Sequence, residues 1–471
     1  MGIYVDKANQ YIEDVLSGKV SACEYVRQSC QRQKNDLVRT TDSKGRPWPY
    51  YFSVEKAERI CAFAEKLPHV QGDWANTKLR LEPWQCFILT TLFGWLKKEN
   101  DKRRFTYAYV EVPRKNGKSF LSSVIGLYMF LMDGEMGAEI YNAAASLKQA
   151  EKIFEPATQI LGKMPGLKNK YGVEVFKQSI FCTQTLSKWS WVVGKSDGAN
   201  PHCALIDEYH EHPDNKVYRT FKRGMASRKQ PLIFIITTAG DNIGCPCKIE
   251  HDHICQVLNN VMPNEREFGI IYTIDKEDDW IDKNSWIKAN PNYGVSVLDD
   301  YIDESMTEAI QKISEQNSIR TKNLNQWMSV DTAFFDLLKL RECSDPNLTP
   351  EKLKGKRCVI GLDLAAKVDL TAMVLLFWDE SNYYSFSKFY LPRNTAMKPE
   401  NDYLRGWADM GLITLHDGAM INQRLIKEDL IKIYDKFDVE AVAFDTWNMA
   451  QMANDLTEEG LTMIEVPTQV R

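Results

Sequence analysis

Short apolar runs alternate with helix-like stretches through the middle of the chain. Between residues 105 and 240, nearly continuous apolar segments are separated by segments whose apolar residues recur with helical spacing. Strands that are buried on both faces have this composition, so the pattern predicts a parallel sheet with helices on both sides. The predicted strands are 106–112, 138–143, 190–193, 202–206 and 232–237.

The flanking regions have a different pattern. Apolar residues line one face of the stretches 20–34 and 54–67, which predicts amphipathic helices. A third helix begins at Pro83, a residue suited to a first helical turn. Residues 241–335 are mostly helical and of mixed character.

A second α/β domain follows a polar, turn-rich segment, DPNLTP at 345–350. Its strands are predicted at 356–364, 371–378, 383–390 and 441–444, with a helix at 422–437. The predicted divisions of the chain are a helical N-terminal or lid region at 1–75, an α/β domain at 76–340, a linker at 341–355 and a second α/β domain at 356–471.

Composition narrows the class of protein. The chain has 471 residues, 26% of them charged and 44% hydrophobic, and a net charge of −5. These values suit a chain that buries cores and exclude a histone-like polycation, so nucleic acid would have to bind to local basic patches. The longest apolar run, 124–132, is too short to cross a membrane, and the N-terminus has no signal-peptide pattern. Eleven cysteines without framework spacing indicate a reducing, cytoplasmic setting.

The sequence PRKNGKS at 113–119 joins the first predicted strand to a helical stretch at 120–132. A strand, a short loop and a helix N-terminus form a phosphate cradle, because backbone N–H groups and the helix dipole face the anion. Lys118 is expected to reach the terminal phosphates and Ser119 to hold Mg²⁺. Val112 stands where the usual first glycine would be, and by pattern alone an unrelated loop-to-helix junction fits as well. The expected nucleotide ligands in this loop are Asn116, Gly117, Lys118 and Ser119.

A phosphate cradle requires carboxylates elsewhere in the chain, one for Mg²⁺ and one to activate water. Asp207 and Glu208 end an apolar run and suit these two roles, although a strand ending in a solvated turn has the same pattern. The strand 232–237 continues into a segment where Thr238 can sense the γ-phosphate. Gln85 precedes the loop, as a reader of the adenine edge should. Each signal is weak alone, and their order along the chain favours a nucleotide site.

Together these motifs resemble the ATPase of the large terminase subunit of tailed bacteriophages, which packages double-stranded DNA into proheads. The segments that carry the resemblance are WQ at 84–85, PRKNGKS at 113–119, DE at 207–208 and TTAG at 237–240. That family's P-loop typically lacks the first glycine and has a basic residue before GKS, so the departure at Val112 becomes a match. The resemblance covers the chain from about residue 75.

The resemblance implies a P-loop NTPase sheet of the RecA/ASCE type that binds ATP and Mg²⁺. It also implies that Arg114 contacts the γ-phosphate, since a planar guanidinium suits a dispersed charge. Glu208 is then the catalytic base, and Lys118 and Arg114 act with it. A ring-shaped motor implies a further arginine from a neighbouring subunit, for which the candidates are Arg219, Arg223 and Arg228.

Two strand ends of the second domain carry aspartates, Asp363 and Asp445. Paired carboxylates at neighbouring strand ends can hold two Mg²⁺ or Mn²⁺ ions for phosphodiester hydrolysis, although turn aspartates often occupy such positions. The resemblance implies an RNase H-like nuclease in which these two are metal ligands. Asp369 is a weaker candidate, since a hairpin-turn aspartate is the simpler interpretation.

The implied nuclease also has a further acidic ligand well after the second aspartate. The candidates on the next helix come early in the sequence, so we expect a C-terminally incomplete site and uncertain cleavage activity in this chain. These candidates are Asp455, Glu458 and Glu459.

The resemblance also implies partners, which are double-stranded DNA, a small terminase subunit and the portal protein of the prohead. It further implies that the chain assembles into a homo-oligomeric ring at the portal and can be a monomer in solution. The protein would act in the host bacterial cytoplasm and transiently at the portal, without a membrane, and be absent from the mature virion. Two alternatives stay open: a helicase or DNA-remodelling ATPase with a non-catalytic C-terminal domain, and an integrase- or resolvase-type nuclease with a degenerate P-loop.

Three other features have simpler explanations. The segment CPCKIEHDHIC at 245–255 fits no compact four-ligand zinc site, so buried thiols and surface histidines are expected there. The basic helical face around Arg219 and Arg223 is either a solvated face or a DNA-phosphate contact. Trp280, Trp286 and Trp327 are expected in a core.

Overall fold

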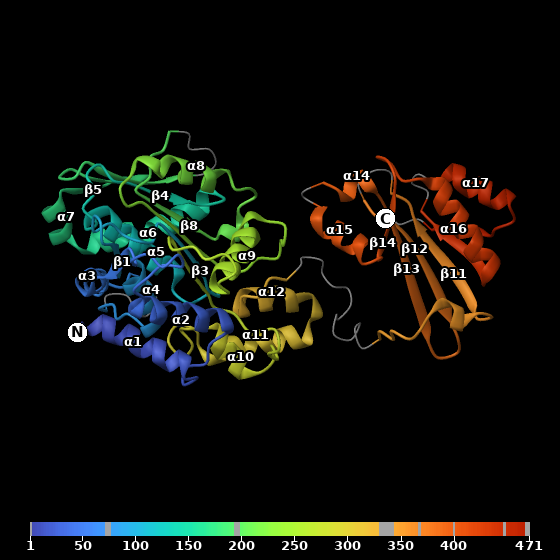
Figure 1. The fold of residues 1–471 in the computed structure, drawn as a ribbon, viewed down its shortest axis with the longest axis horizontal. Helices are drawn as coiled ribbons and strands as arrows, with labels where there is room; N and C mark the ends of the chain where they lie inside the picture. Colours follow the sequence, from blue (N-terminus) through green and yellow to red (C-terminus); the bar gives the residue numbers. More distant parts are fainter. Residues whose placement is uncertain are drawn as a thin grey trace. The chain divides into compact units, whose positions relative to one another are not determined.

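The computed structural model describes residues 2–70, 77–192, 198–328, 343–365, 369–398, 401–445 and 449–466. The chain divides into two compact units, Met1–Lys339 and Leu340–Arg471 (Figure 1). Within the described residues, no helix has both the length and the apolar character needed to cross a bilayer.

An eight-stranded sheet organises the first unit. Its strand order is β10-β3-β9-β8-β4-β7-β6-β5, and the six strands from β10 to β7 are parallel, as predicted. Next to them, β6 runs antiparallel to β7, and the edge strand β5 runs antiparallel to β6. The strands β5, β6 and β10 were not predicted. The strands are β3 (Tyr107–Glu111), β4 (Glu139–Ala143), β5 (Val173–Val175), β6 (Ser179–Cys182), β7 (Ser187–Val192), β8 (Cys203–Asp207), β9 (Leu232–Thr237) and β10 (Glu267–Ile271).

Helices cover both faces of this sheet, as the apolar pattern predicts (Figure 1). The N-terminal helices share one core with a face of the sheet, and α4 is buried on all sides because its sequence is apolar all round. The helices of that face are α1 (Ile3–Leu16), α2 (Glu24–Val38), α3 (Val54–Ala64), α4 (Pro83–Gly94), α5 (Lys118–Leu131), α6 (Leu147–Lys163) and α7 (Pro165–Tyr171). The other face carries α8 (Lys216–Gly224), α9 (Pro246–Leu258) and the 3₁₀ turns η2 (Tyr209–Glu211) and η3 (Met225–Ser227).

Two smaller parts complete the first unit. A short antiparallel pair, β1 (Tyr50–Phe52) and β2 (Trp95–Lys97), joins the N-terminal helices. Three helices after β10 pack around a core of their own that includes Trp280 and Trp286, both buried as expected. They are α10 (Lys283–Ala289), α11 (Asp299–Gln311) and α12 (Ile313–Leu324).

A six-stranded mixed sheet forms the second unit, with order β14-β13-β12-β11-β15-β16. Only β12 runs antiparallel to its neighbours, so the carboxyl ends of the other five strands meet at one edge. The predicted meander, helix and later strand are all present. The strands are β11 (Arg357–Asp363), β12 (Thr371–Trp378), β13 (Tyr383–Pro392), β14 (Ile413–His416), β15 (Asp438–Phe444) and β16 (Met463–Glu465).

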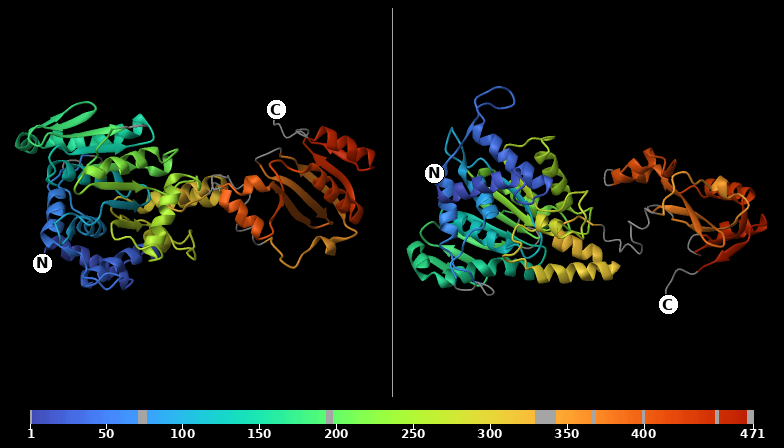
Figure 2. Two further views of the ribbon diagram at one scale, coloured as in Figure 1. Left: turned by 45° about the horizontal axis from the view of Figure 1, so that its top comes forward. Right: turned by 90° about the horizontal axis from the view of Figure 1, so that it is seen from below.

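Strict alternation of buried and partly buried positions in β12 indicates that one face of the central part of this sheet is packed more closely than the other. Helices α16 (Gln423–Lys436) and α17 (Ala450–Glu458) supply the covering core, and Figure 2 shows them in red along that face. The other helical elements are η4 (Pro350–Leu353), α14 (Arg393–Ala396) and α15 (Asp402–Asp409).

Candidate active sites

The loop between β3 and α5 has the backbone geometry of an anion cradle. Gly117 caps α5 in the left-handed region with φ of 77°, and Lys115 is also left-handed with φ of 68°. These two conformations bend the chain so that it enters the helix with free N–H groups at its first turn. Arg114 and Ser119 are exposed on this loop and turn. Val112, which replaces the usual glycine, is fully buried.

Lys118 is buried below the loop. Its Nζ donates to the carbonyl oxygens of Val112 at 3.2 Å and Pro113 at 3.3 Å, and lies 4.0 Å from Glu208 Oε1. Burial lowers the pKa of Lys118 from its ordinary value, and the carboxylates of Glu208 and Asp207 oppose that shift. The ammonium group is therefore enclosed by acceptors at the point where the loop would receive an anion.

The end of β8 brings two carboxylates to the same place. Strand β9 separates β8 from β3, so residues at the carboxyl ends of all three strands are neighbours. Burial and the adjacent Glu208 raise the pKa of Asp207 to about 7. Glu208 lies in the left-handed region with φ of 47°, and its N–H donates to Asp207 Oδ1 at 2.9 Å. A non-glycine residue in this region is strained, and such strain concentrates at functional sites.

The segment after β9 contacts the same carboxylate. Thr238 is buried, and its hydroxyl donates to Glu208 Oε2 at 3.5 Å. The structure thus brings together the side chains of Lys118, Asp207, Glu208 and Thr238.

A cavity of about 570 Å³ lies beside the cradle. Gln85 and Gly117 line it, and a Cβ added to Gly117 would lie 3.8 Å from Gln85 Nε2. The side-chain oxygen of Gln85, Oε1, accepts a hydrogen bond from the backbone N–H of Glu82 at 3.0 Å in a capping box. This contact directs the Gln85 side-chain nitrogen, Nε2, away from the helix end. The rings of His69 and Phe120, 5.5 Å apart between centroids, also line the cavity.

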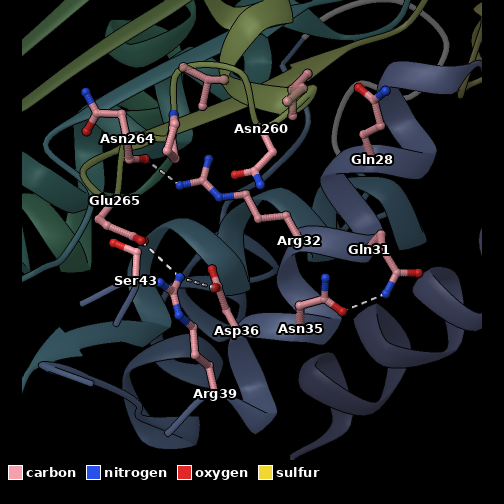
Figure 3. A pocket seen from close by; sticks show the side chains of 13 residues that line it. Gln28, Gln31, Arg32, Asn35, Asp36, Arg39, Ser43, Asn260, Asn264 and Glu265 are labelled. Atoms are coloured by element: carbon pink, nitrogen blue, oxygen red, sulfur yellow. Dashed lines mark hydrogen bonds and ion pairs between the residues drawn. The ribbon is translucent and has the colours of Figure 1, made fainter. Parts of the chain in front are cut away.

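A slightly larger cavity, about 600 Å³, lies elsewhere, between α2 and the segment from α9 to β10 (Figure 3). The Arg32 guanidinium there donates to the carbonyls of Glu267 at 2.8 Å and Asn264 at 2.6 Å. Arg39 pairs with Glu265 at 2.9 Å. These arginines already have partners within the fold, so the size of the cavity does not make it the phosphate site.

The side chain of Asn116 has a structural use that the sequence did not predict. It is fully buried; its Nδ2 donates to Asn290 Oδ1 at 2.8 Å and its Oδ1 accepts the N–H of Asn292 at 3.0 Å. Trp84 Nε1 donates to Asn292 Oδ1 at 2.7 Å. The asparagine side chain therefore fastens the loop to the segment after α10. The only local sequence feature that could have indicated this contact is the segment NPN at 290–292, which supplies both asparagine partners.

The second unit places its two aspartates on adjacent strands. β11 and β15 are parallel, and Leu362 is paired with Phe444, so Asp363 and Asp445 follow at neighbouring strand ends. Asp363 is exposed. The hydroxyl of Thr371 accepts the N–H of Ala365 at 3.0 Å and fixes the chain just after β11.

Other acidic residues of this unit are placed differently. Asp455 of α17 and Glu459, the residue that ends this helix, pair with Lys427 of α16, at 3.9 and 2.8 Å. Glu465 reaches the same sheet edge, but it is paired with Phe444, so strand alternation directs it to the face opposite Asp363. Within the described residues, no group of three or more histidine, cysteine, aspartate or glutamate side chains is arranged to hold a metal ion.

Comparison with known proteins identifies the family. The model of the terminase large subunit ATPase domain matches residues 83–255, and that of the terminase large subunit endonuclease domain matches residues 263–470. The two matches together span most of the chain. It belongs to the terminase large subunits.

Individual relatives agree with this family. Protein YmfN of Escherichia coli (strain K12) is 36% identical over 292 residues, 59% of this chain and 64% of that protein, so the match spans less than two thirds of YmfN. The large terminase subunit of Enterobacteria phage HK97 is 23% identical over 424 residues, covering 87% of this chain and 81% of that protein. The crystal structure of the HK97 large terminase has the same fold, with a TM-score of 0.51, 22% identity and coverage of 88% and 85%.

Contacts of this terminase large subunit distinguish the three candidate arginines. Arg228 is committed to the fold, since its guanidinium donates to Asn200 O at 2.8 Å and Gly137 O at 3.0 Å. Arg219 and Arg223 are exposed on α8, one helical turn apart. Their guanidinium groups are available to a second molecule.

One expectation was wrong. His251 is buried rather than on the surface, with its Nδ1 2.9 Å from Oε2 of the fully buried Glu111. Burial opposes the charged imidazole, but the Glu111 carboxylate outweighs it and raises the pKa of His251 to about 10. Tyr109 donates to the same carboxylate at 2.5 Å. Glu111 is the last residue of β3, directly before the cradle loop, whereas His251 lies on α9, and no local sequence pattern signalled the pair.

Proposed function

We propose that this chain is an ATP-driven motor that packages viral double-stranded DNA into proheads and cuts concatemeric DNA. One observation supports the ATPase activity most strongly. The side chains of Lys118, Asp207 and Glu208 meet at one edge of the sheet, next to the anion cradle at the N-terminus of α5. Membership of the terminase large subunits supports both activities, because an ATPase and an endonuclease domain model match.

In the first unit, ATP would place its phosphates over the α5 N-terminus and its base in the cavity beside Gln85. Lys118 neutralises phosphate charge and Arg114, exposed on the loop, approaches the γ-phosphate. Glu208 orients and deprotonates the attacking water, because its carboxylate is already held beside Lys118. Thr238 contacts Glu208 and so can sense whether the γ-phosphate is present.

The Mg²⁺ that accompanies ATP fits Asp207 and Ser119. The raised pKa of Asp207 shows that nearby positive charge does not fully balance this buried carboxylate. A divalent cation that prefers oxygen ligands, such as Mg²⁺, would provide the missing charge. When bound, the ion would neutralise charge on the phosphate oxygens.

In the second unit, Asp363 and Asp445 would hold Mg²⁺ or Mn²⁺. Two carboxylates at adjacent parallel strand ends, one of them exposed, suit hard cations that take further ligands from water and DNA phosphate. Such ions activate a water and stabilise the leaving oxygen in phosphodiester hydrolysis.

The partners belong to the same proposal. The chain would assemble as a ring on the portal protein of the prohead, with a small terminase subunit selecting the DNA site, in the host bacterial cytoplasm and not in the mature virion. Exposed Arg219 or Arg223 on α8 is suited either to a neighbouring subunit's nucleotide or to the DNA backbone. DNA binding would be largely independent of sequence and therefore salt-sensitive.

Two assays on matched variants test this function. DNA-stimulated ATP hydrolysis should fall by ~10²–10⁴-fold in Glu208→Ala and stay unchanged in Asp214→Ala, which removes a half-exposed carboxylate paired with Lys216. Mn²⁺-dependent plasmid cleavage should be lost in Asp363→Ala and kept in Asp369→Ala. Duplex unwinding without metal-dependent cutting would instead favour a helicase, and unchanged ATP turnover in Glu208→Ala would contradict the motor.

A further inference from the structure

The imidazole of His210 connects the carboxylate of Glu208 with the segment that follows β9. His210 lies in η2, three residues after Asp207, with its side chain 10% exposed. Its Nδ1 is 3.4 Å from Glu208 Oε2, 3.0 Å from Thr237 Oγ1 and 3.4 Å from Thr238 Oγ1. A single ring nitrogen therefore contacts all three side chains.

The partners of Nδ1 determine which tautomer fits. The hydroxyl of Thr237 donates to the carbonyl of Thr238 at 2.9 Å, so it can only accept from the ring. The Glu208 carboxylate can likewise only accept. With its proton on Nδ1 the ring donates to Thr237 Oγ1 at 3.0 Å, and the positive end of the same N–H group lies near Oε2 of the proposed catalytic base, 3.4 Å from Nδ1. On its other side, Nε2 lies 3.4 Å from Oε1 of Glu211, which is half-exposed.

The backbone after β9 is fitted closely around this ring. A Cβ built on Gly240 would lie 3.0 Å from His210 Cβ and 3.2 Å from Cζ3 of Trp327. The N–H of His210 also donates to Thr237 Oγ1 at 3.3 Å. His210 is thus fixed to the β9 end by its backbone and by its ring, and it has little freedom to rotate away.

Glu208 needs such support because its own backbone is strained. Its left-handed conformation costs about 1 kcal/mol or more in a residue with a side chain, and persists where the surroundings fix it. Lys118 holds one carboxylate oxygen at 4.0 Å, while His210 and Thr238 hold the other.

We propose that His210 is a positioning residue for ATP hydrolysis: it fixes the Glu208 carboxylate toward the phosphate cradle and makes its orientation depend on the Thr237–Gly240 segment. The inference rests on the proposed ATPase function. His210 touches neither the cradle loop nor the cavity beside Gln85, so it acts through Glu208. The same ring that aims the base would transmit its movement to the end of β9.

Two amide substitutions separate positioning from bulk. The amide nitrogen of asparagine can occupy the place of Nδ1, whereas that of glutamine reaches the place of Nε2. We expect His210→Ala and His210→Gln to lower kcat by about 10- to 100-fold with KM for ATP within about twofold, and His210→Asn to stay within about threefold of the parent. The control is His253→Ala, which removes a histidine of α9 that pairs with Glu267 of β10, and it should leave kcat unchanged.

The comparison is made on the full chain, with thermal melts and fluorescent-ATP binding alongside DNA-stimulated turnover. Equal kcat values in the Asn and Gln variants, or an unchanged kcat in the Gln variant, would overturn the inference, and this comparison remains decisive if the Ala variant does not fold. A parallel Glu208→Gln variant keeps the two proposals apart. If that variant hydrolyses ATP normally, the ATPase proposal fails; if it is inactive while His210→Gln is fully active, only the positioning role fails.

Discussion

The two proposed catalytic sites of this chain differ in how much of their geometry exists before a ligand arrives. Around the P-loop, Lys118, Asp207 and Thr238 are buried and Glu208 is held by hydrogen bonds on a strained backbone. At the second site, Asp363 is exposed beside Asp445, and the register of two strands provides the alignment. The first site is preorganised by protein contacts, whereas the second relies on bound ions to complete it.

Removal of the buried lysine should separate the two sites most strongly. Lys118→Ala deletes the ammonium enclosed under the cradle and should lower DNA-stimulated ATP hydrolysis by ~10²–10³-fold, because charge stabilisation in a water-poor site is lost. Metal-dependent plasmid cleavage should be unaffected. Lys115→Ala, which removes an exposed lysine of the same loop, is the control. Equal losses in both lysine variants would mean that the buried position has no special role.

The buried ion pair between His251 and Glu111 should contribute strongly to the stability of the first unit. His251→Gln leaves the Glu111 carboxylate without its cation and should cost about 3–5 kcal/mol in urea unfolding. His253→Gln on the same helix breaks a more exposed pair and should cost less than about 1 kcal/mol.

The same pair predicts a pH dependence with a definite sign. The folded-state pKa of His251, about 10, is above its unfolded value, so its contribution is complete below about pH 6.5 and is lost as the pH rises through about 10. Burial acts to raise the pKa of Glu111, but His251 outweighs it and lowers that pKa, so the Glu111 contribution is lost only in acid. The stability difference between wild type and His251→Gln should shrink from neutral to alkaline pH, and a constant difference would argue against the ion pair.

Metal binding without nucleotide should distinguish the two sites again. Because the pKa of Asp207 is raised to about 7, this carboxylate is partly protonated at neutral pH and should bind little Mn²⁺ by itself. In Mn²⁺ titrations followed by electron paramagnetic resonance, Asp363→Asn and Asp445→Asn should each weaken binding by about 10- to 100-fold. Asp207→Asn and Asp369→Asn should not, and a dominant effect of Asp207→Asn would reverse the comparison.

The smallest expected effect concerns the exposed face of α8. If Arg219 and Arg223 contact DNA phosphates, each alanine variant should reduce the slope of log affinity against log salt by about 1. Arg424→Ala, which removes an exposed arginine of the second unit, should leave the slope unchanged. An unchanged slope with reduced ATP turnover would instead assign these arginines to a neighbouring subunit's nucleotide.

Sequence patterns predicted most of the buried strands of the first sheet, but β10, with four of its five residues buried, was missed. Strands β3, β8 and β9 were predicted to within one or two residues because they are buried throughout and apolar up to their last residue. The short strands β5 and β6 were missed, since both are only partly buried and carry polar residues. In the second sheet, β11, β12, β13 and β15 and the helix α16 were predicted, whereas the short strands β14 and β16 were missed.

At the sites, sequence named the residues whose motifs are local. It could not name partners that are distant along the chain: Asn116 meets Asn290 across 174 positions, and Glu111 meets His251 across 140. His210 was missed for another reason. It is close to Glu208 in sequence, but its role depends on the register that brings the end of β9 against η2.

The central claim is that Glu208 is the base of a preorganised ATP site. Single-turnover hydrolysis of radiolabelled ATP tests it most directly, with wild type and Glu208→Gln compared at equal nucleotide occupancy in the presence of DNA. The account predicts that the variant binds ATP with wild-type affinity and hydrolyses it ~10²–10⁴-fold more slowly. Hydrolysis of bound ATP at the wild-type rate would contradict it.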